Sequence, residues 1–189
     1  YRTTALLASL RARGVRLVDV PSTDSVAGTE DAITAVAAAI GHRERGVAAI
    51  AAFRRDLTRI GQGPGRGRTA AYYQRQGYLT GTGTLVDDMM RRVGLMNLAS
   101  RLGGSPLLRL STEEMILARP NFLIMETGAP AKSDRGAAML SHPALAAAVP
   151  ARRRLYIPEA LTTCGGSAYP RAVAMLAAQV RAADVGGGR

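Results

Sequence analysis

The stretch LSTEEMILARPNFLIMET, residues 110–127, decides the fold of this chain. Ser111 followed three residues later by Glu114 is the pattern of a capping box, so we expect a helix that ends before Pro120. Residues 121–126 (NFLIME) are a short, mostly apolar run that predicts a buried strand. A helix that leads directly into a buried strand is typical of an α/β fold with a parallel sheet.

The N-terminal segment repeats this order of helix and strand. Residues 3–13 place three leucines on one face of a helix, and Gly14 stands where a helix C-cap is expected. Residues 15–20 (VRLVDV) are rich in β-branched side chains and end at Pro21, so they are predicted to form a strand. We interpret this segment as a second αβ unit.

A long helical region follows, from about residue 27 to residue 60. Interruptions at Gly41-His42 and at Gly46 predict either two helices or one bent helix. The region is long compared with the average helix of about 11–12 residues, and helices of such length commonly span two lobes. The loop QGPGRG, residues 62–67, is a candidate boundary after it.

The rest of the chain alternates strands and helices. Strands are expected at 69–74, 121–126 and 154–157, helices at 85–92, 112–118, 142–149 and 169–183, and a glycine-threonine turn at 77–84. The order strand, helix, helix, strand, helix, strand, helix indicates a three-layer α/β/α, Rossmann-like lobe.

Arginine dominates the charge of the chain. Among 25 basic residues only Lys132 is a lysine, and the formal net charge is +11. Such a charge is compatible with a basic nucleic-acid-binding α/β module, because arginines neutralise phosphates. The arginine clusters at 11–13, 66–68 and 152–154 contain no interleaved aromatic side chains that would stack on bases. Because a basic surface equally attracts anionic ligands, nucleic-acid binding is kept as the alternative function.

The residues that catalysis or metal binding would need are sparse. Cys164 is the single cysteine, which excludes an intrachain disulfide and a cysteine-based zinc site. His42 and His142 have no carboxylate or histidine at metal-binding spacing, and no Gly-Lys-Ser/Thr phosphate loop is present. Asp87 and Asp88 are adjacent, so they point to different faces of a helix. We expect no enzymatic activity, no resident cofactor and no metal site.

No apolar run reaches the roughly 18 residues that span a membrane, so no transmembrane segment is expected. Residues 1–4 (YRTT) lead directly into a helical pattern without the features of a signal peptide. We therefore expect that the chain starts as though it had been cut from a longer sequence.

Four segments, in their order, resemble the periplasmic substrate-binding proteins of iron-siderophore and cobalamin ABC transporters, the class III family with a helical backbone. These segments are ALLASLRARGVRLVDVP (5–21), the helical run at 27–60, GTGTLVDDMMRRVGLMNLASRLG (81–103) and LSTEEMILARPNFLIMET (110–127). The phrase SHPALAAAVPARRRLYIPEAL (141–161) and a closing amphipathic helix continue in the order of the family. The departure is the N-terminal lobe, of which only the last helix and strand are present.

The resemblance implies a domain organisation and a function. Residues 1–25 would be the remnant of the N-terminal lobe, 26–62 a long rigid helical linker between the lobes, and 63–189 the C-terminal lobe. The protein would capture an iron-siderophore, haem or corrinoid (cobalamin-like) chelate between the lobes in the periplasm. It would deliver this ligand to the membrane permease of an ABC importer without covalent chemistry.

The resemblance also implies ligand contacts at the turn of residues 77–84, which faces the cleft in the family. Tyr78, Thr80 and Thr82 would offer hydroxyl groups to the ligand. The structural alternative is that the glycines permit a tight turn and that Thr84 caps the following helix.

A second set of candidates follows from the rule that ligands of open α/β sheets sit beyond the carboxyl ends of the strands. Glu126 and Thr127 end one predicted strand, and Thr162 and Thr163 lie in the loop after the next one. Tyr169 is expected in a loop beside the same cleft. The other tyrosines considered are expected to fill strands: Tyr72, Tyr73 and Tyr156.

Glu113 is implied as the residue that docks onto the permease. In the family a glutamate at this place in each lobe pairs with arginines of the permease, and Ser111-Thr112-Glu113 aligns with it. An exposed carboxylate is a bidentate partner for arginine and fixes the docking register by charge pairing. The alternative is that Glu113 and Glu114 only complement the positive N-terminal end of their helix.

Overall fold

The centre of the fold is a mixed sheet in which three parallel strands form the middle and one edge. This computed structural model describes residues 4–60, 63–127, 138–162 and 165–185. The strands follow the order β4-β2-β1-β5-β6, with β3 paired to β1. Their bounds are β1 Thr69–Tyr73, β2 Tyr78–Thr80, β3 Met96–Asn97, β4 Leu107–Arg109, β5 Phe122–Thr127 and β6 Arg154–Pro158. Strands β1, β5 and β6 run parallel, whereas β2 is antiparallel to β1 and to β4.

The three long strands lie where the sequence predicted them, but three short strands were not predicted. Strand β2 lies inside the segment expected to be only a glycine-threonine turn, which corrects that expectation. Strands β2, β3 and β4 have two or three residues each. Such short segments show no alternation from which a strand can be recognised, and they form because β1 and β2 offer them pairing partners.

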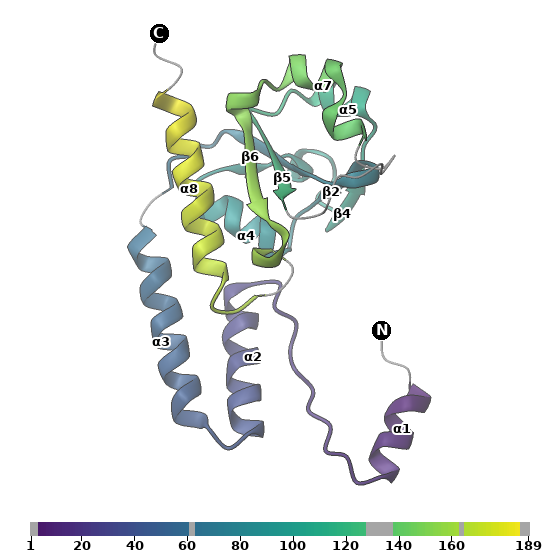
Figure 1. The fold of residues 1–189 in the computed structure, drawn as a ribbon, viewed down its shortest axis with the longest axis vertical. Coiled ribbons are helices and arrows are strands. Elements are labelled where there is room, and N and C mark those ends of the chain that lie inside the picture. Colours follow the sequence, from purple (N-terminus) through teal and green to yellow (C-terminus); the bar gives the residue numbers. More distant parts are fainter. Residues whose placement is uncertain (1–3, 61–62, 128–137, 163–164, 186–189) are drawn as a thin grey trace.

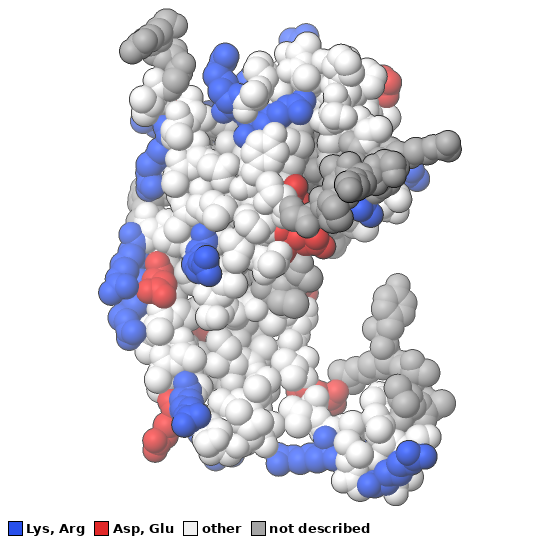
Figure 2. All heavy atoms as spheres, in the orientation of Figure 1, with Lys and Arg blue, Asp and Glu red and all other residues white. Residues whose placement is uncertain are grey.

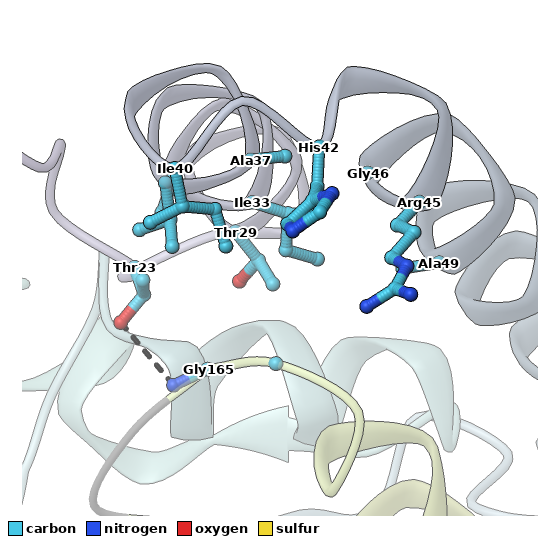
Figure 3. Close-up of a pocket in the computed structure, with 13 residues that line it drawn as sticks. Thr23, Thr29, Ile33, Ala37, Ile40, His42, Arg45, Gly46, Ala49 and Gly165 are labelled. Atoms are coloured by element: carbon cyan, nitrogen blue, oxygen red, sulfur yellow. Dashed lines mark hydrogen bonds between the residues drawn. The ribbon is translucent and has the colours of Figure 1, made fainter.

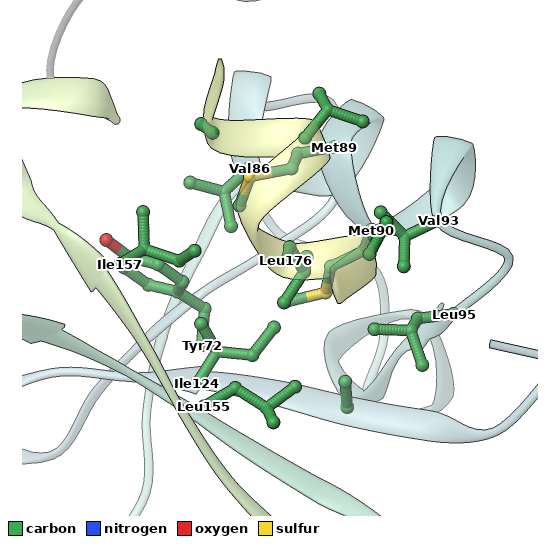
Figure 4. Close-up of a cluster of buried hydrophobic side chains, with 14 of the residues drawn as sticks. Tyr72, Val86, Met89, Met90, Val93, Leu95, Ile124, Leu155, Ile157 and Leu176 are labelled. Atoms are coloured by element: carbon green, nitrogen blue, oxygen red, sulfur yellow. The ribbon is translucent and has the colours of Figure 1, made fainter. Parts of the chain in front are cut away.

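Alternation along the parallel strands gives the sheet two apolar faces. Tyr72 and Ile124 belong to one core cluster, together with Met90 of α4 and Leu176 of α8 (Figure 4). Their neighbours in the strands, among them Leu123, belong to the other cluster. Because successive side chains of a strand point to opposite faces, one strand supplies both cores.

Helices cover both faces and complete a three-layer α/β/α lobe, as predicted (Figure 1). The helices of the first face are α3 Arg43–Ile60, α4 Leu85–Arg92 and α8 Tyr169–Val185, and those of the second are α5 Thr112–Ala118 and α7 Pro143–Ala148. Helix α5 carries the predicted capping box, because Ser111 Oγ accepts from Glu114 N and Glu114 Oε2 accepts from Ser111 N.

Residues 26–60 form a hairpin of two helices, which is one of the two arrangements that the sequence predicted. Helix α2, Val26–Ala39, runs away from the sheet, and the chain reverses at Gly41, whose φ is 76°, before α3 returns (Figure 1). Glu30 and Arg54 join the two helices through an ion pair of 2.5 Å. The predicted interruption at Gly46 is absent, because this residue lies inside α3. A Cβ atom at Gly46 would lie 2.6 Å from the Cβ of Ala37, so glycine permits the two helices to pack closely.

The N-terminal segment does not form the predicted αβ unit. Helix α1, Thr4–Ala12, is present, but residues 15–20 are not a strand. Val15, Val18 and Val20 are exposed, and among the described strands none lies beside them to supply hydrogen bonds. This segment meets the lobe at Thr23, whose Oγ1 accepts a hydrogen bond of 3.2 Å from Gly165 N.

In the described parts of the chain, no helix has the length and apolar character needed to cross a membrane.

Candidate functional site

Five polar side chains form a hydrogen-bonded group at the carboxyl ends of the central strands; we call them the polar cluster. Glu126 Oε1 accepts from Tyr72 Oη at 2.9 Å and from Gln74 Nε2 at 2.8 Å. Tyr72 Oη lies 3.0 Å from Thr162 Oγ1, and Thr80 Oγ1 donates to Gln74 Oε1 at 3.2 Å. Four segments of the chain are thereby joined: β1, β2, β5 and the turn after β6.

Parallel pairing explains why these residues meet. Tyr72 is opposite Ile124 in the β1–β5 register, so the end of β5 brings Glu126 within reach of the phenol. The ring of Tyr72 is buried in the core, and this burial, with the nearby charge of Glu126, raises the pKa of its hydroxyl far above the usual value. The phenol therefore stays protonated and acts as a hydrogen-bond donor to Glu126.

The predicted sites Thr80, Glu126 and Thr162 are brought together by the fold. Sequence reasoning missed Gln74 as a member and placed Tyr72 only as a strand filler. The signal for Gln74 was its position as the last residue of the strand predicted at 69–74.

Thr82 has a structural partner. Its hydroxyl donates to the carbonyl oxygen of Gly104. Thr84 caps α4, since its Oγ1 accepts from Asp87 N at 3.2 Å, as the structural alternative predicted. Gly81 is required because a Cβ atom there would collide with the carbonyl oxygen of Ser105.

Asp87 ties this turn to the sheet. It is only 6% exposed, and its Oδ2 accepts from Gly83 N at 3.2 Å. Its Oδ1 accepts from Asn97 Nδ2 at 3.2 Å, and the same amide donates to Thr80 O at 3.3 Å. Sequence analysis correctly separated Asp87 from its neighbour by helix face, but it did not identify either as a support for the turn.

Tyr78 lies beside the polar cluster and not within it. Because side chains two residues apart in a strand share a face, Tyr78 and Thr80 point to the same side of β2. The ring of Tyr78 is 37% exposed, and the guanidinium carbon of Arg109 lies 5.9 Å from its centroid. Arg109 is the partner of Tyr78 in the β2–β4 register.

The expected position of Tyr169 is wrong. It is the first residue of α8 and only 1% exposed, not a residue of a loop beside a cleft. Its ring centroid lies 6.2 Å from that of Phe53, and its hydroxyl donates to Asp88. Burial, followed by the hydrogen bond to Asp88, raises the pKa of this phenol well above its usual value. Tyr169 therefore belongs to the core.

The other predicted sites are dispersed. Thr127 ends β5 and is exposed, whereas Thr163 lies outside the described residues. Glu113 is exposed in the first turn of α5, toward the other end of the sheet from the carboxyl end of β6 (Figure 1). Hydrogen bonds from its own backbone and from the side chain of Ser111 lower the pKa of Glu113.

A hollow separates the lobe from the projecting N-terminal segment. Figure 2 shows this hollow and acidic side chains on its lobe side. The carboxyl ends of β5 and β6 point toward it (Figure 1). The polar cluster at these strand ends therefore borders an open space, where a ligand can approach it.

A separate apolar pocket of about 370 Å³ lies between the α2–α3 hairpin and the loop at Gly165 and Gly166. Figure 3 shows Ile33 of α2 and Ile40, which follows that helix, on one side and Arg45 of α3 on the other. Of the residues predicted as ligand contacts, none that the structure describes lines this pocket.

A family model described as "Periplasmic binding protein" matches residues 3–161. This chain belongs to the periplasmic binding protein family. The expected family membership and fold class are thus confirmed. A search of curated proteins finds no match.

Solved structures agree with this family. The periplasmic heme-binding protein BhuT in complex with two hemes is 22% identical, with a TM-score of 0.75 over 97% of this chain and 72% of BhuT. The heme-binding protein RhuT from Roseiflexus sp. RS-1, in apo form, is 27% identical, with a TM-score of 0.69 over 96% and 73%. The vitamin B12 binding protein BtuF of Vibrio cholerae is 15% identical, with a TM-score of 0.69 over 97% and 71%.

The descriptions of these solved relatives name binding proteins, and a structure similar to this chain is an ABC transporter substrate-binding protein from Listeria monocytogenes EGD-e. The family implies a periplasmic location. The nucleic-acid alternative finds no support among them.

Proposed function

We infer that this protein captures a metal chelate, namely a ferric siderophore, haem or a cobalamin-like corrinoid, for delivery to the permease of an ABC importer. The observation that carries the proposal is the polar cluster at the carboxyl ends of β1 and β5, bordering the hollow, in a chain of this family. Binding needs no covalent step, because hydrogen-bonding groups and an exposed aromatic ring are sufficient to hold a chelate.

The edge of the lobe offers complementary chemistry for such a ligand. Thr80, Thr127 and Thr162 supply hydroxyl groups, and Glu126 accepts hydrogen bonds. Tyr78 presents an exposed ring beside the guanidinium of Arg109. An aromatic ring packs on a flat macrocycle, and a guanidinium pairs with carboxylates of a chelate, so this side of β2 suits a planar anionic ligand.

Docking onto the permease is assigned to Glu113. Its neighbour Glu114 is occupied by the capping box, which leaves the exposed carboxylate of Glu113 for a partner. Because its pKa is lowered, Glu113 stays charged at neutral pH and under mild acidity. A single exposed carboxylate suits a bidentate contact with an arginine of the permease.

The test is a titration of the purified protein with haemin, a ferric hydroxamate siderophore and cyanocobalamin, followed by absorbance and by melting temperature. A ligand at about 100 times its Kd stabilises the native state by roughly 2.7 kcal/mol, which gives a measurable rise. We expect one of the three to bind, and Glu126→Gln to weaken it at least fivefold. Glu44→Gln, an exposed site in the first turn of α3, is the matched control. If none of the three ligands binds, the proposal is wrong.

A further inference from the structure

Three arginines surround a second pocket, of about 400 Å³, which none of the described residues predicted as ligand contacts lines; we call it the arginine pocket. It lies where the carboxyl ends of α3 and α4 meet the loop before β1 and the side of α8. Its lining residues are Leu57, Ile60, Gly63, Arg66, Gly67, Arg91, Arg92, Gly94 and Val173. The pocket therefore combines guanidinium groups with an apolar floor.

The pocket has more guanidinium groups than there are carboxylates in contact with them. Arg92 Nε lies 2.6 Å from Asp88 Oδ2. Arg91 is 64% exposed, and its contacts to Asp87 and Asp88 are long, at 3.4 and 3.8 Å. Such exposed, distant pairs are worth little, so Arg91 is available for another anion. Arg66 has no salt bridge within the described residues; its charge acts on Asp184, which already forms an ion pair with Arg68, so the carboxylates around the pocket leave an excess of positive charge.

The loop that carries Arg66 is held in place by its glycines. Gly65 N donates to Val93 O and Gly67 N donates to Gly94 O, each at 2.8 Å. A Cβ atom on Gly65 would collide with the backbone of Gly94, so this close approach requires glycine. Arg66 itself has a left-handed backbone, with φ of 53°. A backbone held in a sparsely populated conformation is commonly found at binding sites, where it presets the position of a side chain.

We propose that the arginine pocket binds the phosphate group of a small organic phosphate, with the organic part on the apolar floor. Guanidinium groups match phosphate oxygens in a bidentate geometry, and three of them around one pocket favour a doubly charged group over a single carboxylate. The pocket volume lies within the range of about 300–1,000 Å³ that is usual for small-molecule sites. The same chemistry is presented by a soluble phosphate ester and by an anionic phospholipid headgroup.

Two titrations distinguish these sources. Calorimetry with phenyl phosphate tests the soluble monoester, and co-sedimentation with vesicles that contain phosphatidic acid, against phosphatidylcholine vesicles, tests the monoester headgroup. We expect saturable binding in at least one arm. Arg66→Gln and Arg91→Gln should each weaken it at least fivefold, because each removes a guanidinium from the rim. Arg101→Gln, which changes an exposed arginine outside the pocket, should change it less than twofold.

Two results would overturn the proposal: no binding in either arm, or an equal loss in Arg101→Gln, which would mean that only net charge matters. Melting temperatures check that the variants fold. The same variants are titrated with the chelates of the proposed function, whose binding should not change. The proposal of a phosphate site and the proposal of a chelate site can thus be refuted independently of each other.

Discussion

The phenol of Tyr72 donates a hydrogen bond of 2.9 Å to Oε1 of Glu126, and this bond joins the ends of two neighbouring parallel strands. The ring of Tyr72 is buried in the core, and Glu126 lies at the end of β5 that borders the hollow. The relationship couples stability to the candidate ligand site: the core fixes the phenol, the phenol fixes one carboxylate oxygen, and the second oxygen of Glu126 has no donor among the described residues.

Removing the Tyr72 hydroxyl should cost stability. Tyr72→Phe keeps the ring but removes the hydrogen bond to the charged Glu126, which keeps only Gln74 as a donor, and a hydrogen bond to a charged group is worth about 1.5–3 kcal/mol. We expect the free energy of unfolding in urea to fall by that amount, and chelate binding to weaken. Tyr156→Phe changes an exposed tyrosine and is the control, with an expected change below about 0.5 kcal/mol. Equal losses in both variants would contradict the role of the Tyr72 hydrogen bonds.

Alkaline pH should destabilise the fold through two buried phenols. Burial raises the pKa of Tyr72 and of Tyr169 in the folded state, whereas tyrosines in the unfolded chain ionise near pH 10. The unfolded state therefore releases protons first, so the stabilising contribution is complete below about pH 10 and declines as the pH rises above it. We expect the free energy of unfolding to decrease above pH 10, and to decrease less steeply in a Tyr72→Phe/Tyr169→Phe variant. An unchanged slope in that variant would show that other groups are responsible.

Asp87 should matter more than a surface aspartate. Asp87→Asn keeps the shape but removes the charge that accepts from Gly83 N and Asn97 Nδ2, so we expect a loss of about 1–3 kcal/mol in urea unfolding. Because Asn97 also contacts Thr80 O, chelate affinity should fall as well when it is measured on fully folded protein. Asp56→Asn breaks an exposed pair with Arg59 and should change stability by less than about 1 kcal/mol. A loss of stability with unchanged chelate affinity would show that Asp87 supports the fold alone.

The parts of the fold with strong local patterns could be predicted, and the parts that depend on partners could not. The buried strand at 121–126 and its preceding helix were evident from a cap, a proline and an apolar run. Residues 15–20 have a strand-like composition, but a strand exists only where another strand supplies hydrogen bonds. The hairpin of α2 and α3 was similarly ambiguous, because the glycine at position 41 marks an interruption without giving its angle.

The candidate site was predictable only in part for a related reason. Glu126 and Thr162 follow from the rule on strand ends, which needs only the order of elements, whereas Thr80 was implied by the resemblance to the family. The roles of Tyr72 and Gln74 depend on the β1–β5 register, which brings their side chains to Glu126. That register is not encoded in either strand alone. The helix that begins at Tyr169 was predicted, but the burial of its first side chain against Phe53 depends on the packing of α3 on α8, which the local sequence does not encode.

The close packing of the hairpin should respond to the size of residue 46. In Gly46→Ala the added Cβ atom would lie 2.6 Å from the Cβ of Ala37, so the helices must separate. Such overpacking costs typically about 1–3 kcal/mol, although alanine gains about 1 kcal/mol in helix propensity. We expect a net loss in thermal unfolding, and recovery in the double variant Gly46→Ala/Ala37→Gly. No recovery in the double variant would mean that the Ala37 contact does not set the spacing.

Substitutions of two adjacent glutamates of α5 should affect helix capping and docking separately. Glu114→Gln replaces the carboxylate of the capping box, so it should lower stability by about 0.5–1 kcal/mol and leave transport by the protein with its permease nearly unchanged. Glu113→Arg changes an exposed residue and should leave chelate affinity intact, but it should reduce transport in permease-containing vesicles at least tenfold, because two cations repel at the contact. Since the pKa of Glu113 is lowered, docking should persist as the pH falls through the range where an ordinary glutamate takes up its proton, and weaken only below that range. Normal transport by Glu113→Arg would remove this residue from the interface.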